Sequence, residues 1–211
     1  MIALILIFAI FTALVSAETQ GITPHDMYSS SIGVLGCKID TNRVAYWPMG
    51  VDCNNICVRV KYQGRSVELL RIDQSGGAYD ISYDAYNYLV TGQSARTRPI
   101  TGSPVNMEVE IIDPGNCVKY LRAGGLPLSA ANSMNYVASC LQQPNSWVAR
   151  NYRLFNIQDP VCHWGWDEMC SLNLGVSNQP TCPHQLGTTN GRLPDTVFNI
   201  EYGTGRVVPA P

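Results

Sequence analysis

Two aspartates, Asp73 and Asp80, bracket a glycine turn and are the residues of this chain best suited to acid–base chemistry. They lie on either side of Ser75-Gly76-Gly77. A pair of carboxyl groups can hydrolyse a glycosidic bond when they stand about 5–5.5 Å apart for retention or about 6.5–9.5 Å apart for inversion. The structural alternative is that Asp73 pairs with Arg71 or caps the turn, and that Asp80 is an acid near a helix N-terminus.

The elements that must position these acids can be predicted from the surrounding pattern. Apolar residues from Val67 to Ile72 predict a strand, and the glycines after it allow a positive φ. A second short extended piece, 78–81, follows the turn. Ser82 is the expected N-cap of a helix with Asp84 in its first turn, and the residues expected on its buried face are Tyr83, Tyr86 and Leu89 or Val90.

Further elements flank this stretch. The alternating run 57–62, followed by Gln63-Gly64 and another strand, predicts a β-hairpin. Residues 106–111 predict a strand that ends at the turn Asp113-Pro114-Gly115. Later in the chain, 129–142 predicts one long helix with Ser129 as its N-cap.

Aromatic side chains form a second group of candidates, because flat rings can stack on sugars. They are Trp47, Tyr79, Tyr83, Trp147, Trp164 and Trp166. Most large aromatic residues are expected in the core. The loop 162–170 differs, since Trp164 and Trp166 lie two residues apart between cysteines and are difficult to bury together. We interpret this loop as a recognition loop.

Composition and cysteine content limit the class of protein. The apolar run of residues 1–17 ends in Val-Ser-Ala, which predicts a secretory signal peptide, and the alternative is an uncleaved membrane anchor. The eight cysteines that follow predict four disulfides in a secreted chain rather than a zinc site or a thiolate nucleophile. We expect no metal, no cofactor, and no membrane contact after cleavage. A net charge of −2 with interspersed signs argues against a nucleic-acid partner.

A family resemblance follows from the central segment. The runs CVRVKYQGRSVELLRIDQSGGAYDISYDAYNYL and VNMEVEIIDPGNC, with GCKIDTNRVAYWPMGVDCNNIC upstream, resemble the double-psi β-barrel of barwin and the expansins. The resemblance covers about residues 33–117, and the remainder has only a general similarity to secreted fungal proteins with this barrel. It implies a mainly β fold, with a six-stranded barrel, a short helix and a disulfide-bonded helix and loop extension.

The resemblance also implies bridges and site residues. It implies the disulfides Cys37–Cys53 and Cys57–Cys117, while a third family bridge is absent at both ends, at Ser75 and near Trp47. The spacing Cys53-x3-Cys57 is one residue longer than in the family. Asp73 and Asp80 fall on the acidic groove positions, and Asp40 lies near the usual base without its aromatic motif. The remaining four cysteines are expected to pair among themselves, and Cys140–Cys162 with Cys170–Cys182 is one of three possibilities.

These observations predict an organisation and a function. We expect a signal peptide at 1–17, an irregular segment at 18–32, the barrel at 33–117 and an extension packed on it at 118–211. The expected function is extracellular, non-hydrolytic binding of cell-wall polysaccharide through Asp73, Asp80, Tyr79, Trp47, Trp164 and Trp166. The alternatives are a glycoside hydrolase and a secreted effector or inhibitor that binds a host or self protein.

Overall fold

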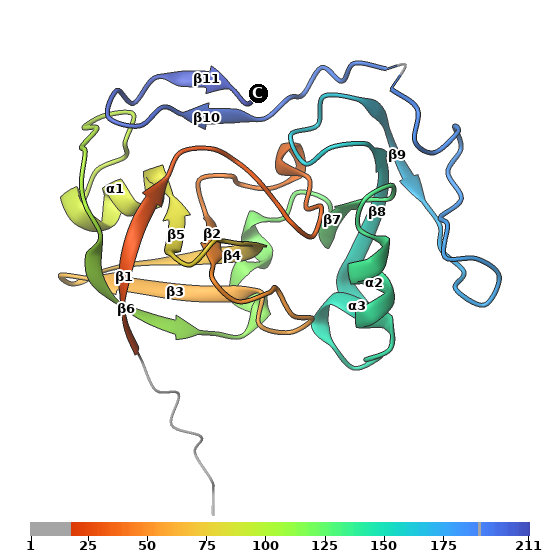
Figure 1. Cartoon of the computed structure of the whole chain (residues 1–211), viewed down its shortest axis with the longest axis horizontal. Coiled ribbons are helices and arrows are strands. Elements are labelled where there is room, and N and C mark those ends of the chain that lie inside the picture. The colour runs from red at the N-terminus through yellow and green to blue at the C-terminus, as the bar shows by residue number, and fades with distance from the viewer. Residues whose placement is uncertain (1–17, 190) are drawn as a thin grey trace, which may run out of the picture.

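A computed structural model describes residues 18–189 and 191–211, so the segment expected to be a signal peptide lies outside the described residues. The architecture is a closed six-stranded barrel beside a smaller three-stranded sheet, with a two-stranded hairpin above the barrel (Figure 1). The barrel strands are β1 (Glu18–His25), β2 (Val44–Trp47), β3 (Cys57–Tyr62), β4 (Arg65–Gln74), β5 (Tyr79–Ser82) and β6 (Val105–Ile111).

The strands pair around the barrel in the order β1-β5-β2-β4-β3-β6. β1 runs parallel to β5, and β2 runs parallel to β4, while the other neighbours are antiparallel. Exchanging β1 with β4, β2 with β5 and β3 with β6 leaves the set of paired strands unchanged. The barrel therefore has the pairing symmetry of two interlocked halves.

The segment 18–32 contains a barrel strand and is not irregular as expected. β1 is hydrogen-bonded to β5 on one side and to β6 on the other, and it closes the barrel. Its burial pattern explains the error, because Ile22 is its one fully buried residue and the remaining side chains do not alternate in hydrophobicity. The barrel thus runs from Glu18 to Ile111 rather than from residue 33.

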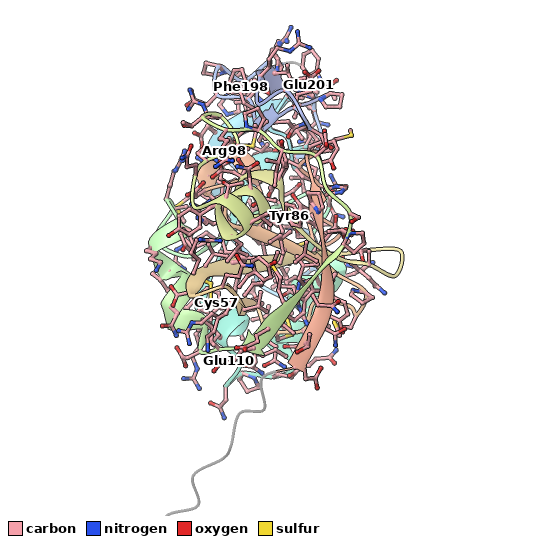
Figure 2. All side chains as sticks on the ribbon, turned by 90° about the vertical axis from the view of Figure 1, so that its left-hand side faces the viewer. Cys57, Tyr86, Arg98, Glu110, Phe198 and Glu201 are labelled. Atoms are coloured by element: carbon pink, nitrogen blue, oxygen red, sulfur yellow. A yellow bond between two sulfur atoms is a disulfide. The ribbon has the colours of Figure 1, made fainter. Side chains whose placement is uncertain are left out.

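The predicted hairpin and the helix after the glycine turn are confirmed. Strands β3 and β4 pair from Cys57–Leu70 to Tyr62–Arg65, around a turn in which Gln63 and Gly64 both have positive φ. Helix α1 (Tyr83–Thr91) follows β5 and contributes Tyr86 and Leu89 to the core inside the barrel. Figure 2 shows Tyr86 on this helix. Ser82 occupies the N-cap position, but its hydroxyl donates to the Asn42 carbonyl oxygen at 2.7 Å.

The extension joins the barrel through a second core. Its elements are η2 (Pro114–Tyr120), β7 (Leu126–Ser129), α2 (Met134–Leu141), α3 (Trp147–Asn151), β8 (Tyr152–Ile157), β9 (Gly165–Cys170), β10 (Phe198–Ile200) and β11 (Val207–Pro209), and a short turn of helix, η1 (Gly36–Lys38), precedes β2. Barrel residues such as Val44 and Leu70 share this core with Val137 and Leu154 of the extension.

The single long helix expected at 129–142 is wrong at its beginning. Ser129 is the last residue of β7, and α2 starts only at Met134 after Ser133. Strand β7 pairs in parallel with β8, which lies outside the window that the helical pattern covers. The residues of α2 that are buried are Val137 and Cys140.

The disulfides tie the extension to the barrel in a way that the sequence did not indicate. Cys57–Cys117 forms as the resemblance implied, and Cys170–Cys182, part of one of the three pairings left open for the extension, also forms. The expected Cys37–Cys53 and Cys140–Cys162 bridges are wrong, because Cys37 bonds Cys162 and Cys53 bonds Cys140. Two bridges therefore connect the N-terminal part of the chain to the extension.

Candidate functional site

The two candidate acids belong to one polar row that crosses four adjacent barrel strands. Asp80 of β5 pairs with Thr23 of β1 on one side and with Tyr46 of β2 on the other. Tyr46 in turn pairs with Asp73 of β4, at a position where the register of β2 and β4 shifts. The structure thus brings both sequence-predicted acids to the same central residue, Tyr46, which the sequence did not identify.

Asp73 holds the segment that follows β1. Its carboxylate accepts hydrogen bonds from the Ser29 hydroxyl at 2.6 Å, the Ser31 amide at 2.9 Å and its neighbour's amide, Gln74, at 2.7 Å. Its expected ion pair with Arg71 does not form. Buried Arg71 instead donates to the Gly50 carbonyl oxygen at 3.0 Å and lies 3.5 Å from an Asp52 carboxylate oxygen.

Asp80 is engaged on the other side of the row. It accepts a hydrogen bond from the Thr23 hydroxyl, which β1 presents directly opposite it. Asp40, the remaining acid considered for catalysis, caps its own turn by accepting from the Asn42 amide at 3.0 Å. Each of these three carboxylates therefore has a donor from the protein itself.

Two buried tyrosines lie at the acid row, Tyr46 within it and Tyr28 next to it. Burial raises the pKa of Tyr46, and the nearby charges of Asp73 and Asp80 raise it further. Burial likewise raises the pKa of Tyr28, whose hydroxyl donates to the Val34 carbonyl oxygen at 2.8 Å. Both phenols are protonated at neutral pH, and Tyr46 is additionally covered by the His25 ring, whose centroid lies 4.7 Å away. The 25–31 segment therefore packs against Tyr46 and Asp73, while both acids of the row stay partly exposed.

Among the aromatic candidates of the barrel, Trp47 does not present a binding face. Its side chain is 2% exposed and belongs to the core inside the barrel. Tyr79 is partly exposed, and its ring meets Trp47 edge-on with centroids 5.1 Å apart. The prediction of Trp47 as a substrate-binding residue is therefore wrong in this structure, because β2 directs it inward next to Ala45 and Ile81.

The tryptophans of the extension are exposed, as the sequence indicated. Trp164 is 40% exposed and Trp166 is 37% exposed. Trp166 lies on β9, an edge strand of the three-stranded sheet, which pairs with β8 on one side. Its indole stacks on the imidazole of His184, with ring centroids 3.9 Å apart and planes inclined by 8°.

Glu168 holds the His184 ring that stacks on Trp166. One carboxylate oxygen lies 2.6 Å from Nδ1 of His184, and the other accepts from the His184 amide at 2.8 Å and from the Asn156 side chain at 2.9 Å. Burial opposes ionisation, but these hydrogen bonds from His184 and Asn156 outweigh it and lower the pKa of Glu168. The imidazole is thus fixed in position against the partly exposed indole. We call Trp166, Glu168 and His184 the Trp166 platform.

The bridged cysteines decide what the cysteine-rich loop can do chemically. All eight are in disulfides, so none supplies a thiolate for metal binding or nucleophilic attack. In the described part of the chain, no helix is long and apolar enough to cross a membrane.

Comparisons with protein-family models, with curated proteins and with solved structures found no match to this chain.

Sequence reasoning missed three of the residues that build these sites. Thr23 was missed because β1 carries no alternating pattern, and Tyr46 because its position between the acids depends on pairing among β2, β4 and β5. His184 was missed as the partner of Trp166. Residue 184 lies in a loop with no strand or helix periodicity that would predict contact with β9. The Cys170–Cys182 bridge brings the two segments together.

Proposed function

We propose that this protein is secreted and binds cell-wall polysaccharide without hydrolysing it, on a barrel of the double-psi type. The pairing symmetry of the six strands supports the barrel type, because each half supplies one member of both parallel pairs. Four disulfides support secretion, since such bridges are characteristic of oxidising compartments.

The Trp166 platform is the observation that carries the binding proposal. Sugars present flat apolar faces, and an indole face that is fixed and exposed is suited to pack against them. Trp166 is held in place because the His184 ring stacks on one of its faces, with centroids 3.9 Å apart, and Glu168 holds His184. An exposed ring that is already ordered loses little conformational freedom when a ligand binds.

The hydrogen bonds of the acids support a non-hydrolytic role. A hydrolase of this kind needs one carboxyl group facing the scissile bond and a second acting as base or nucleophile. Asp73 uses its carboxylate to hold Ser29, Ser31 and Gln74, and Asp80 accepts from Thr23. We therefore assign both acids to holding the barrel and the 25–31 segment together.

Binding to insoluble polysaccharide tests this proposal. The purified protein should sediment with insoluble glucan or chitin, and Trp166→Ala should weaken binding by about tenfold, the scale of one lost aromatic contact. Val176→Ala is the control, since that side chain is 83% exposed, apolar and outside the platform. Unchanged sedimentation of a folded Trp166→Ala variant would remove the platform from the binding site.

Release of reducing ends tests the absence of hydrolysis. We expect none from a soluble β-glucan, and Asp80→Asn should change stability or binding rather than turnover. Sustained release by the wild type that Asp80→Asn lowers by about 10²-fold or more would instead make Asp80 a general acid.

Binding to a protein is the second candidate function, and the exposed apolar side chains near β9 favour it. They come from one stretch of the extension: Trp164, Trp166, Met169, Leu174 and Val176. Exposed apolar groups gathered in one region are typical of interaction surfaces. This candidate is preferred if no polysaccharide sediments the protein and if Val176→Ala, rather than Trp166→Ala alone, weakens its binding to an extracellular protein.

A further inference from the structure

A cleft of about 460 Å³ lies between the barrel side of the chain and the segment that leads into β10. Residues from the start of the chain line it together with Arg96 and Arg122, namely Gly36, Cys37, Ile39, Thr41 and Asn42. Residues 194–198, Ile200 and Val207 complete the lining. A cleft of about 300–1,000 Å³ is of the size that ligand sites occupy. It is separate from the Trp166 platform and from the acid row.

The cleft contains arginine side chains without protein partners. Every lysine of the chain has an acidic partner, namely Asp167 for Lys38, Glu110 for Lys61 and Glu68 for Lys119. Most arginines are likewise engaged through their guanidinium groups. Within residues 18–189 and 191–211, the arginines whose guanidinium groups have no hydrogen bond or ion pair are Arg96, Arg98, Arg122 and Arg192.

The backbone of Arg96 is fixed by its neighbours. The Ala95 amide donates to buried Asp84 at 2.9 Å. On the other side the turn between β10 and β11 packs against the loop at Gly205, where a Cβ would lie 2.3 Å from the Ala95 carbonyl oxygen and 3.4 Å from the Arg96 Cα. Figure 2 shows the labelled Arg98, from the same loop, between α1 and this hairpin. Arg96 therefore extends from a loop that cannot readily move away.

The backbone of Arg122 is also fixed, on a different segment. Its amide donates to the Lys38 carbonyl oxygen at 2.9 Å, and its neighbour Leu121 forms a bridge with Ile39. The two guanidinium groups thus belong to separate, anchored parts of the chain that line one cleft. Because neither guanidinium group has a protein partner, both can donate hydrogen bonds to a ligand in the cleft.

The charge of the cleft selects the ligand. Arg96 and Arg122 contribute two positive charges, and Asp195 contributes the one negative charge among the residues that line it. Guanidinium groups bind carboxylates with two parallel hydrogen bonds, which gives both affinity and orientation. Hydroxyl and amide groups of Thr41, Asn42 and Thr196 line the same space and suit the hydroxyl groups of a sugar.

We propose that this cleft binds an acidic polysaccharide through its uronic-acid residues, with Arg96 and Arg122 bound to their carboxylate groups. The inference rests on the proposed function and names the class of polysaccharide. The segment that enters the cleft at Pro194 is also held to the tryptophan loop, because the Leu193 amide donates to the His163 carbonyl oxygen at 2.9 Å and Arg192 forms an isolated β-bridge with Trp164.

Calorimetric titration with a defined oligogalacturonate tests the proposal, with its methyl ester as the matched neutral ligand. We expect Arg96→Gln and Arg122→Gln each to weaken binding of the acid by about tenfold, the scale of one hydrogen-bonded charge pair. The methyl ester should bind wild type as weakly as the acid binds the variants. Arg98→Gln is the control, because it removes an unpartnered arginine of the same loop that does not line the cleft.

Three outcomes would overturn the proposal. They are equal binding of the acid and its ester, an equal loss in Arg98→Gln, and tighter binding of a sulfated oligosaccharide than of the uronate. Failure here is distinguishable from failure of the proposed function. Sedimentation with neutral glucan that depends on Trp166 would keep the protein a polysaccharide binder even if the cleft had no preference for uronate.

Discussion

Replacing Asp84 by Asn should destabilise the protein by removing the ion pair between Asp84 and Arg43. Asp84 is buried in the first turn of α1 and accepts from the Ser94 hydroxyl at 2.5 Å and the Ala95 amide at 2.9 Å. Its other oxygen lies 3.1 Å from a guanidinium nitrogen of Arg43. Asparagine can still accept the first two hydrogen bonds, but its amide group would face the donor of Arg43.

The expected cost follows from the burial of this pair. Removing one partner of a fully buried ion pair costs about 3–5 kcal/mol, and a hydrogen bond to a charged group contributes about 1.5–3 kcal/mol. Arg43 retains its hydrogen bond to the Asn42 carbonyl oxygen, and a quarter of its side chain is exposed. The charge left behind is thus partly solvated, so we expect a loss of about 2–3 kcal/mol in the free energy of unfolding.

Urea unfolding under non-reducing conditions, followed by tryptophan fluorescence, measures this loss. The midpoint should fall while the slope stays constant. Glu201→Gln is the control, because Glu201 pairs with Arg206 at the surface, and this variant should unfold close to wild type. A loss below about 1 kcal/mol for Asp84→Asn would mean that solvent screens the Arg43 pair as it screens a surface pair, and the reasoning would be refuted.

Two further predictions concern a bridge and an ion pair. Cys170→Ala with Cys182→Ala should cost about 3 kcal/mol in the loop-entropy model, because that bridge spans 12 residues, and thermal unfolding that shows no loss would contradict it. The same double variant should weaken glycan binding, since the bridge holds His184 near Trp166. Loss of stability with unchanged sedimentation would contradict a role of the bridge in binding. The hydrogen bond from Lys119, opposed by burial and helped by Arg59, lowers the pKa of Glu68 below 4.5. Its stabilising contribution is thus present above pH 4.5 and is lost as the pH falls through the lowered value, so Glu68→Gln should lose less stability on acidification than wild type, and parallel acid-unfolding curves would contradict this.

The local elements of this protein follow from short-range patterns in its sequence. The β3–β4 hairpin, the glycine turn after Gln74 and the helix from Tyr83 depend on alternation, turn residues and helical spacing, all of which lie within a few residues of one another. The exposure of Trp164 and Trp166 also followed from local crowding between cysteines. The Cys57–Cys117 bridge was implied by a resemblance that covers both cysteines.

Features that depend on residues distant in the chain are set by the tertiary structure. Strand β1 exists because β5 and β6 supply both of its hydrogen-bonding edges, so no pattern within Glu18–His25 was required. Cys37 reaches Cys162 only because the extension folds back on the barrel, across a separation of 125 residues. Asp73 and Asp80 likewise acquired their roles from Ser29 and Thr23, which chain closure brings to them. Side-chain chemistry can be read along a sequence, but the donor that occupies a carboxylate is set by packing.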